Sequence, residues 1–228
     1  MSGVALADQS HALSRHYAQK DAAYFNGARH DFVARLPQDA GAAILEVGCG
    51  TGATGVAAFA AGRAARYVGI EIDPASAESA RAVLNEVLIG DVERLELPWQ
   101  PATFDALILS EVLEHLVDPW AVLARLARVV RPGGMVLASS PNVAHWRLIR
   151  ELVCGHFRLT DRGVLDRTHL RWFTPESFAA MFEGAGFTVE RVGPVTPFAP
   201  RTARLCRMAG GHIDHLFMTQ IALQARKR

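Results

Sequence analysis

The chain has 228 residues, of which 50% are hydrophobic and 21% are charged, and its formal net charge at pH 7 is +1. This is the balance of an ordinary soluble globular protein. The near-zero net charge excludes a bulk attraction to nucleic acid or anionic lipid. The length suits one α/β domain with additions.

Cysteine spacing and the lengths of the apolar runs indicate the cellular compartment of the protein. Cys49, Cys154 and Cys206 are scattered without a CxxC pair, so neither a disulfide scaffold nor a zinc cage is predicted. We expect them to fill core space in a reducing cytoplasm. The N-terminal stretch lacks the pattern of a secretory signal, and no apolar run approaches membrane-spanning length. The sequence therefore predicts a cytoplasmic protein with no membrane span.

Strand-like and helix-like stretches alternate through the first two thirds of the chain. Amphipathic helices within residues 10–36 come first, and we expect residues 1–41 to form an N-terminal helical lid. Strands are then predicted at 42–48, 66–73, 86–91, 104–112 and 135–142, and helices at 53–64, 74–84 and 118–131. This alternation is typical of a parallel sheet with crossover helices.

The regular alternation ends after residue 142. Residues 143–174, with a helix at 145–153, are predicted to be an insertion that covers the substrate. A helix begins at Pro175 and a strand follows at 187–195. A Pro-rich, basic connection at 196–211 then leads to a last strand at 215–227. We expect residues 42–228 to form one domain.

A glycine-rich loop follows the first predicted strand. Residues 50–55 match G-x-G-x-x-G, but the glycines begin earlier, at Gly48, and Glu46 lies inside the end of the strand. Glycines let the backbone approach a ligand closely and leave helix N–H groups free to bind it. A carboxylate at this place suits a ligand with a positive group. The loop therefore favours an amino-acid-bearing sulfonium over a dinucleotide.

The chain resembles the class I S-adenosylmethionine-dependent methyltransferases in several motifs. They are "LEVGCGTG" (45–52), "VGIEID" (68–73), "GDVERL" (90–95), "FDALILSEVLEHL" (104–116) and "RPGGMVLASSPN" (131–142), in the family's order and spacing. Several motifs in register are more specific than one glycine loop. The resemblance implies a Rossmann-like α/β fold: a seven-stranded, mostly parallel sheet with a reversed last strand and helices on both faces.

The same resemblance implies S-adenosylmethionine as the cofactor. The resemblance implies ten cofactor-binding residues, which in chain order are Glu46, Gly48, Gly50, Gly52, Glu71, Ile72, Asp91, Val92, Ser110 and Glu111. The first four would lie by the methionine part of the cofactor, and the last two by the sulfonium. A carboxylate at a strand end, such as Glu71, can accept hydrogen bonds from two vicinal ribose hydroxyls. Asp91 and Val92 would meet the adenine. Taken singly, Glu71 could be only an acidic helix start and Asp91 only a turn cap.

Methyl transfer to a hydroxyl needs a base or a metal ion, because the acceptor must lose a proton. Glu111, Glu114 and His115 share one face if the chain turns helical after the fourth strand. Two carboxylates and an imidazole would make half a site for a divalent ion. Polar pairs at a helix start are the alternative.

His169 lies after the fifth strand, in the region that covers the carboxyl ends of the strands. The pattern E-x-x-E-H followed by a distant histidine resembles the small-RNA 2′-O-methyltransferases and the ubiquinone-pathway O-methyltransferases. That resemblance implies Glu111, Glu114, His115 and His169 as ligands of a magnesium or manganese ion, on which an alcohol loses its proton readily. Without a metal, His115 or His169 is the predicted catalytic base.

The stretch "GVLDRTHLRWFT" (163–174) resembles methyltransferases associated with polysaccharide and glycoside assembly. Aromatic faces and arginine suit sugar rings and acidic groups. The residues predicted to contact the substrate are Asn142, Arg167, Arg171 and Trp172. The alternative is that the arginines pair with Asp161 and Asp166 while the aromatic rings pack on the core.

Three functions follow, in this order. The first is an O-methyltransferase that acts on a hydroxyl of a sugar, polyol or small natural product, with or without a metal. The second is a methyltransferase for an aromatic or quinone-type phenol, and the third is a cofactor-binding regulatory module without turnover. The partner is expected to be a small molecule or glycoside and not a nucleic acid. The pattern predicts neither the acceptor's identity nor the oligomeric state.

Overall fold

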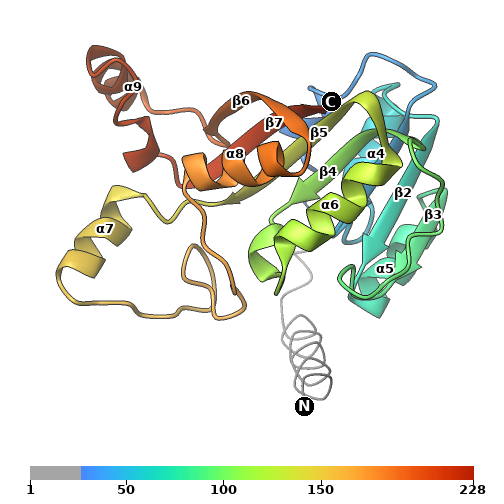
Figure 1. Ribbon diagram of the computed structural model, residues 1–228, viewed down its shortest axis with the longest axis horizontal. Coiled ribbons are helices and arrows are strands. Elements are labelled where there is room, and N and C mark those ends of the chain that lie inside the picture. The colour runs from blue at the N-terminus through green and yellow to red at the C-terminus, as the bar shows by residue number, and fades with distance from the viewer. Residues whose placement is uncertain (1–26) are drawn as a thin grey trace. The chain divides into compact units, whose positions relative to one another are not determined.

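Seven strands form one sheet in the order β3-β2-β1-β4-β5-β7-β6 (Figure 1). The computed structural model describes residues 27–228. β1 pairs with β2 and β2 with β3 in parallel, whereas β6 and β7 are antiparallel. The predicted seven-stranded, mostly parallel sheet with a reversed last strand is confirmed.

Two compact units divide the described chain. The first contains the residues up to Ile108 together with Arg128–Met135, and the second contains Leu109–Ala127 and Val136–Arg228. The division runs through β4 and β5. Each unit is described below by itself.

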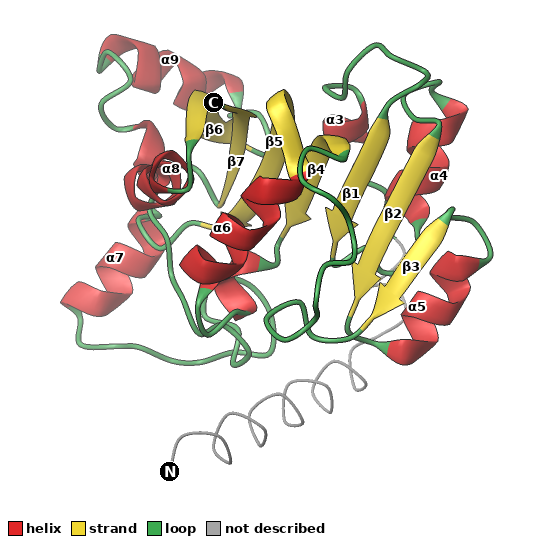
Figure 2. Ribbon diagram, turned by 45° about the vertical axis from the view of Figure 1, so that its right-hand side comes forward, coloured by secondary structure: helices red, strands yellow, loops and turns green. Residues whose placement is uncertain are grey.

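The first unit consists of short strands that alternate with helices. Its elements are α3 (His30–Val33), β1 (Ala43–Val47), α4 (Ala53–Ala60), β2 (Arg66–Glu71), α5 (Pro74–Arg81), β3 (Glu86–Ile89) and most of β4 (Phe104–Ser110). β1 and β2 are buried almost throughout, as strands covered on both faces are. Figure 2 shows β1, β2 and β3 side by side, with α5 next to β3. Each strand predicted for this unit is present.

Local sequence signals explain where the helices of the first unit begin. Asp73 caps α5, because its carboxylate accepts a hydrogen bond of 2.8 Å from the backbone N–H of Ser76, and Pro74 takes the first helical position. Gly52 precedes α4 with φ +86°, and a Cβ there would lie 2.8 Å from the side chain of Val83. Glycine is therefore required at the point where the loop enters α4.

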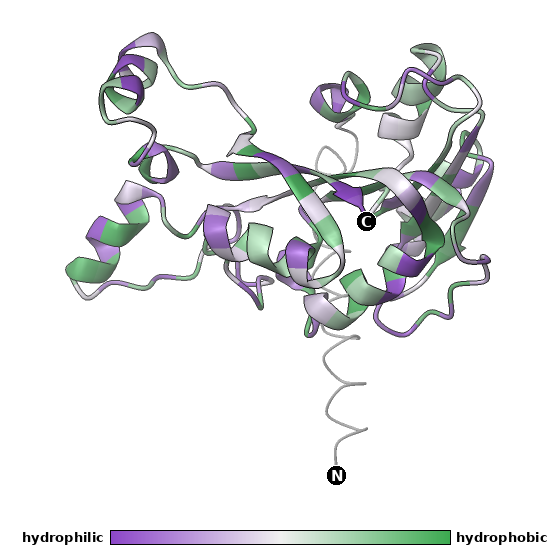
Figure 3. Ribbon diagram, turned by 45° about the horizontal axis from the view of Figure 1, so that its top comes forward, coloured by the Kyte–Doolittle hydropathy of each residue, from purple (hydrophilic) through white to green (hydrophobic). Residues whose placement is uncertain are grey.

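The second unit holds the remaining elements. They are the end of β4, the 3-10 turn η1 (Leu113–His115), most of α6 (Pro119–Val129), the second half of β5 (Val130–Pro141), α7 (Trp146–Val153), α8 (Pro175–Gly184), β6 (Phe187–Pro194), α9 (Pro200–Met208), η2 (Asp214–Leu216) and β7 (Gln220–Lys227). α8 packs on β6: the ring centroid of Phe182 in α8 lies 6.1 Å from that of Phe187 in β6 and 5.2 Å from that of Phe178, also in α8. The ribbon of α7 carries both hydrophobic and hydrophilic residues (Figure 3).

The condition under which Glu111, Glu114 and His115 would share one helix face is not met. The chain does not turn α-helical after β4, because Glu111 has φ +54° in the left-handed region, which interrupts a helix, and only the short 3-10 turn η1 follows. One prediction of local structure is wrong. The connection predicted at 196–211 contains α9 instead. Pro200 occupies its first turn, where the fixed φ of proline suits a helix, and helix-forming residues follow.

Smaller differences lie at the ends of elements. β5 begins at Val130 and not at 135, and the last strand begins at Gln220 after the turn η2. Most of the predicted lid, residues 1–26, lies outside the described residues, and the remainder contains α3. Among the described residues, no helix combines the length and the apolar run that crossing a bilayer requires.

Candidate functional site

The glycine loop of the first unit is held in a sharp turn next to a buried carboxylate. Gly48 and Gly50 have φ of +71° and +55°, which glycine adopts without strain. The backbone N–H of Gly48 donates to the carbonyl of Ile70 at 2.8 Å, which ties the loop to the end of β2. Glu46, two residues before the loop, is 2% exposed. The predicted methionine-binding residues thus lie together at the ends of β1 and β2.

Glu46 sits in an environment that disfavours its charge. Burial raises its pKa to about 7, against the hydrogen bonds that it accepts from Tyr67 and Thr54 and the positive charge of Arg29. The hydroxyl of Tyr67 donates to Oε2 of Glu46 at 2.8 Å. The charged Glu46 would gain most from a ligand that brings a cation.

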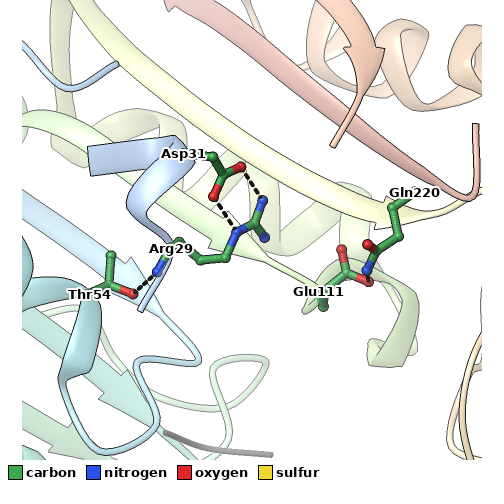
Figure 4. Close-up of polar contacts among 5 residues, drawn as sticks. All are labelled: Arg29, Asp31, Thr54, Glu111 and Gln220. Atoms are coloured by element: carbon green, nitrogen blue, oxygen red, sulfur yellow. Dashed lines mark hydrogen bonds and ion pairs between the residues drawn. The ribbon is translucent and has the colours of Figure 1, made fainter. Parts of the chain in front are cut away.

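Arg29 is a residue of this region that the sequence did not single out. Its backbone N–H donates to Oγ1 of Thr54 at 3.3 Å, and its side chain forms two hydrogen bonds of 2.9 Å with Asp31 (Figure 4). The guanidinium also lies 3.8 Å from the ring centroid of Phe32. Arg29 belongs to no glycine motif, and only the packing of α3 on α4 brings it to the loop.

Glu71 bridges two backbone segments. Its Oε2 accepts a hydrogen bond of 2.8 Å from Gly50 N–H, and its Oε1 accepts one of 2.9 Å from Asp73 N–H. Burial raises the pKa of Glu71 above its ordinary value, although these hydrogen bonds oppose the rise. The predicted ribose-binding carboxylate therefore also joins the glycine loop to the start of α5.

The predicted adenine-side residues follow β3. Asp91 is half-buried, caps the N–H of Glu93 at 2.9 Å, and lies 3.6 Å from Arg94. Val92 is 6% exposed, and Ile72 is half-buried after β2. Asp91 thus caps a turn, which was the alternative to a binding role. Its contact with the adenine stays a prediction.

Three of the four predicted metal ligands come together in the second unit. Donor atoms of Glu114, His115 and His169 lie within 4.8 Å of one another, and all three residues are buried. The two imidazole rings pack edge to face at a centroid distance of 4.7 Å. Residues 54 positions apart in sequence therefore form one compact group of donors.

The orientation of both imidazoles follows from their backbone partners. Nδ1 of His115 lies 3.2 Å from the carbonyl oxygen of Thr168, and Nδ1 of His169 lies 3.0 Å from that of Val164. A carbonyl oxygen can only accept, so each Nδ1 carries the proton and donates it. In the neutral ring, Nε2 then holds the lone pair. Metal-binding histidines commonly use this arrangement.

Backbone hydrogen bonds join the segment that bears His169 to η1. The N–H groups of Leu170 and Arg171 donate to the carbonyl of Glu114 at 2.8 and 3.0 Å. Ser140, in β5, donates its hydroxyl to Oε2 of Glu114 at 3.2 Å. The backbone of Glu114 therefore anchors the segment that bears His169, while a residue of β5 holds the Glu114 carboxylate.

Glu111, the fourth predicted ligand, is not in this group. Its Oε2 accepts a hydrogen bond of 3.0 Å from Nε2 of Gln220, at the start of β7 (Figure 4). Its backbone conformation, at φ +54°, costs roughly 1–3 kcal/mol and is kept only where the surroundings enforce it. Ser110, which precedes it, ends β4 and is half-buried.

The predicted substrate residues are held largely by their own chain. Asn142 is fully buried, and both of its amide N–H groups donate to backbone carbonyls, those of His215 and Met218, at 2.7 and 2.8 Å. No side-chain N–H of Asn142 remains for a substrate. Asn142 also forms an isolated parallel bridge with Phe173, so the segment between them begins and ends at neighbouring points.

The arginines and the tryptophan of residues 163–174 differ in exposure. Arg167 pairs with Asp161 at 3.1 Å on the surface, as the structural alternative predicted. Arg171 donates to the carbonyls of Val117 and Leu170. Trp172 is 38% exposed and donates its indole N–H to Val164 at 3.2 Å. Trp172 therefore presents an aromatic face to solvent.

Comparison with known proteins identifies the relatives of the chain. The model of a family described as "Methyltransferase domain" matches residues 14–192. A ubiquinone biosynthesis O-methyltransferase of Xylella fastidiosa (strain M23) is 30% identical over 185 residues, which cover 78% of this chain and 73% of that protein. A probable S-adenosylmethionine-dependent methyltransferase of Mycolicibacterium smegmatis is 33% identical over 150 residues, which cover 64% of this chain but only 58% of that relative's length.

A solved structure shares the fold. The S-adenosylmethionine-dependent methyltransferase from Archaeoglobus fulgidus aligns with a TM-score of 0.61 at 20% sequence identity, covering 90% of this chain and 96% of that one. At this identity the likeness concerns the fold and not the substrate.

Proposed function

The chain belongs to the class I S-adenosylmethionine-dependent methyltransferases, and from that membership we propose that it transfers the methyl group to a hydroxyl oxygen. The observation that carries this proposal is the buried group of Glu114, His115 and His169. A hydroxyl acceptor must lose its proton, and such a group supplies either a base or an ion site. The O-methyltransferases among the relatives support the same acceptor atom.

The donor set suits a divalent ion. One carboxylate oxygen and two imidazole nitrogens fit Mn²⁺ better than Mg²⁺, since Mg²⁺ prefers oxygen ligands throughout. A bound ion would lower the pKa of a coordinated hydroxyl. The protein's own contribution is orientation: the carbonyls of Thr168 and Val164 hold the histidine rings, and Ser140 holds Glu114. Without an ion, Nε2 of His115 or His169 takes the proton directly.

The cofactor is proposed to bind in the first unit at the glycine loop. Glu46 would face the positive end of the methionine part, and Arg29 would serve its carboxylate. Glu71 would accept hydrogen bonds from the ribose hydroxyls. In the reaction the S–CH₃ bond of the sulfonium breaks while the O–CH₃ bond forms, the hydroxyl proton passes to the base, and neutral S-adenosylhomocysteine leaves. A dry pocket and close alignment supply much of the rate.

Two acceptor classes remain, and we favour a quinone-type phenol over a sugar or polyol. The ubiquinone biosynthesis relatives support the phenol. So do the large apolar side chains that residues 146–172 expose, among them Trp146, Phe157 and Trp172. Residues 163–174, which resemble methyltransferases of glycoside assembly, support a sugar hydroxyl as the second candidate, since aromatic faces also stack on sugar rings. Location in the cytoplasm stays a prediction.

A methyl-transfer screen tests the proposal. Radiolabelled S-adenosylmethionine would be offered with catechol-type phenols, glycosides and RNA, each with EDTA and with added Mn²⁺. Transfer to a hydroxyl that EDTA abolishes and Mn²⁺ restores would support the ion site, whereas full activity in EDTA would reject it. Tight cofactor binding without transfer to any acceptor would favour the regulatory module.

Two histidine variants test whether His169 takes part in catalysis. His169→Ala should lower turnover by roughly a hundredfold or more, since general acid–base catalysis contributes about 10²–10⁴. Its cofactor Kd should stay within about twofold. His156→Ala is the matched control, because His156 is exposed on the same insertion. Unchanged turnover in His169→Ala would remove it from the catalytic group.

A further inference from the structure

A buried carboxylate, that of Asp166, shapes the turn that leads to His169. The side chain of Asp166 is 4% exposed. Its Oδ1 accepts two hydrogen bonds from Thr168, one of 2.9 Å from the backbone N–H and one of 2.7 Å from the hydroxyl. Its backbone carbonyl accepts a third bond, of 3.0 Å, from the N–H of His169. Asp166 therefore holds the backbone of both Thr168 and His169.

These bonds fix the peptide group that joins Thr168 to His169. A peptide group is planar, so the direction of its N–H also sets the direction of its carbonyl. The N–H of this group donates to the carbonyl of Asp166, and its own carbonyl, that of Thr168, accepts from Nδ1 of His115 at 3.2 Å. The direction of the acceptor for His115 thus follows from the turn that Asp166 closes.

The same turn carries the acceptor of the second imidazole. Nδ1 of His169 donates to the carbonyl of Val164 at 3.0 Å. The backbone N–H of Asp166 donates to the carbonyl of Gly163, also at 3.0 Å, and Asp166 forms an isolated bridge with Thr160. Val164 therefore lies inside a turn that is bound at Gly163 and at Asp166.

Asp166 is not itself one of the clustered donors. Among the described residues, the donor atoms within 4.8 Å of one another belong to Glu114, His115 and His169. In a histidine metal site, the group that accepts the Nδ1 proton fixes the tautomer and the direction of the ring. Here the acceptors are peptide carbonyls, which can do this only if the backbone around them is held in place.

We infer that Asp166 is a positioning residue, whose carboxylate holds the carbonyl of Thr168 against His115 and so presents Nε2 of that ring to an ion or to the proton of the acceptor. The inference rests on the proposed function, because it assigns Asp166 to the same group of donors. It has a consequence for the protein without any ligand: the tautomer of His115 depends on the side chain of Asp166.

The experiment reads the tautomer by nitrogen NMR of the full chain with ¹⁵N-labelled histidine, without metal and at a pH where the rings are neutral. His115 should carry its proton on Nδ1 in the wild type, and Asp166→Ala should raise the share of the form protonated on Nε2. The Kd of Mn²⁺, followed by electron paramagnetic resonance, should rise by about tenfold or more in Asp166→Ala, as for other groups that orient metal-binding histidines.

Two further variants separate positioning from general support of the fold. Asp166→Asn keeps an acceptor oxygen at the same place, and Asn forms the same kind of turn, so it should keep the wild-type tautomer and a Mn²⁺ Kd within about threefold of the wild type. Asp161→Ala is the matched control, because Asp161 is a carboxylate of the same insertion that pairs with Arg167 on the surface. It should change neither the tautomer nor the Kd.

An unchanged tautomer of His115 in Asp166→Ala would overturn the inference. Equal losses in Asp166→Ala and Asp166→Asn would overturn it as well, because the acceptor oxygen would then not matter. If Asp166→Ala fails to fold, as judged by thermal unfolding, Thr168→Val carries the test. It removes the hydroxyl that donates to Asp166 and should shift the tautomer in the same direction. A wild-type chain that binds no Mn²⁺ but shows the tautomer shift in Asp166→Ala would support the inference and contradict only the proposed ion site.

Discussion

The ionisation of Glu46 predicts a pH dependence of cofactor binding in the neutral range. Burial places its pKa at about 7 in the free protein. If the cofactor's positive end requires the ionised form, that form makes up about 9% of Glu46 at pH 6 and about 76% at pH 7.5. The Kd of S-adenosylmethionine should therefore be about eightfold higher at pH 6 than at pH 7.5. The sign follows from the carboxyl group, which gains charge as pH rises.

Calorimetry in two buffers of different ionisation heat measures both Kd and proton release. At pH 6 the binding reaction should release about 0.9 proton, because most Glu46 is then protonated in the free protein. Glu46→Gln should bind more weakly and lose this dependence on pH. A wild-type Kd that is flat from pH 6 to 7.5, or an equal slope in Glu46→Gln, would refute the reasoning.

Three further predictions concern the same loop and the helix that follows the insertion. Tyr67→Phe removes the hydroxyl that stabilises charged Glu46, so the midpoint of the pH profile should move to higher pH in the same calorimetric titration. Gly52→Ala should lower the free energy of unfolding in urea by about 2 kcal/mol, because of its positive φ and the close side chain. Gly62→Ala has a similar φ but open space, and a loss as large there would show that packing at Gly52 adds nothing. Thr174→Ala removes the capping box of α8 and should cost about 1 kcal/mol in thermal unfolding, whereas an unchanged Tm would show that the cap contributes nothing.

Much of the first unit could be predicted because its signals are local. Apolar runs that end in glycine or acidic residues predicted β1 and β2, and the Asp73–Pro74 pair predicted the start of α5. In the second unit, two features of the local structure were not predictable from the sequence pattern. The turn after β4 depends on the backbone of Glu111, whose φ of +54° no residue pattern announces. The Pro-rich connection contains α9, because a proline in the first turn begins a helix as readily as it ends one.

In the candidate site, too, local motifs predicted some residues, and contacts between distant parts of the chain were not predicted. Motifs predicted the residues that now lie at the ends of β1 and β2, and they predicted the three donors of the buried group. They did not predict Tyr67, Arg29 or Gln220, each of which acts through a partner distant in sequence. Such contacts depend on strand order and helix packing, and a short motif carries neither. Asn142 shows the converse, since a residue in a motif proved to serve the fold through its backbone partners.

The bridge between Asn142 and Phe173 has a consequence for protein engineering. The segment leaves and rejoins the fold at adjacent points, and Val143 N–H donates to the carbonyl of Phe173 at 3.0 Å. Loop closure depends only weakly on length, so residues 144–159, which precede the bridge of Thr160 with Asp166, form a replaceable cassette whose size can change at small cost. His169 lies outside the cassette and is anchored through its neighbours to the carbonyl of Glu114. Exchange of this cassette between relatives offers a way to alter acceptor range while the reacting groups stay in register.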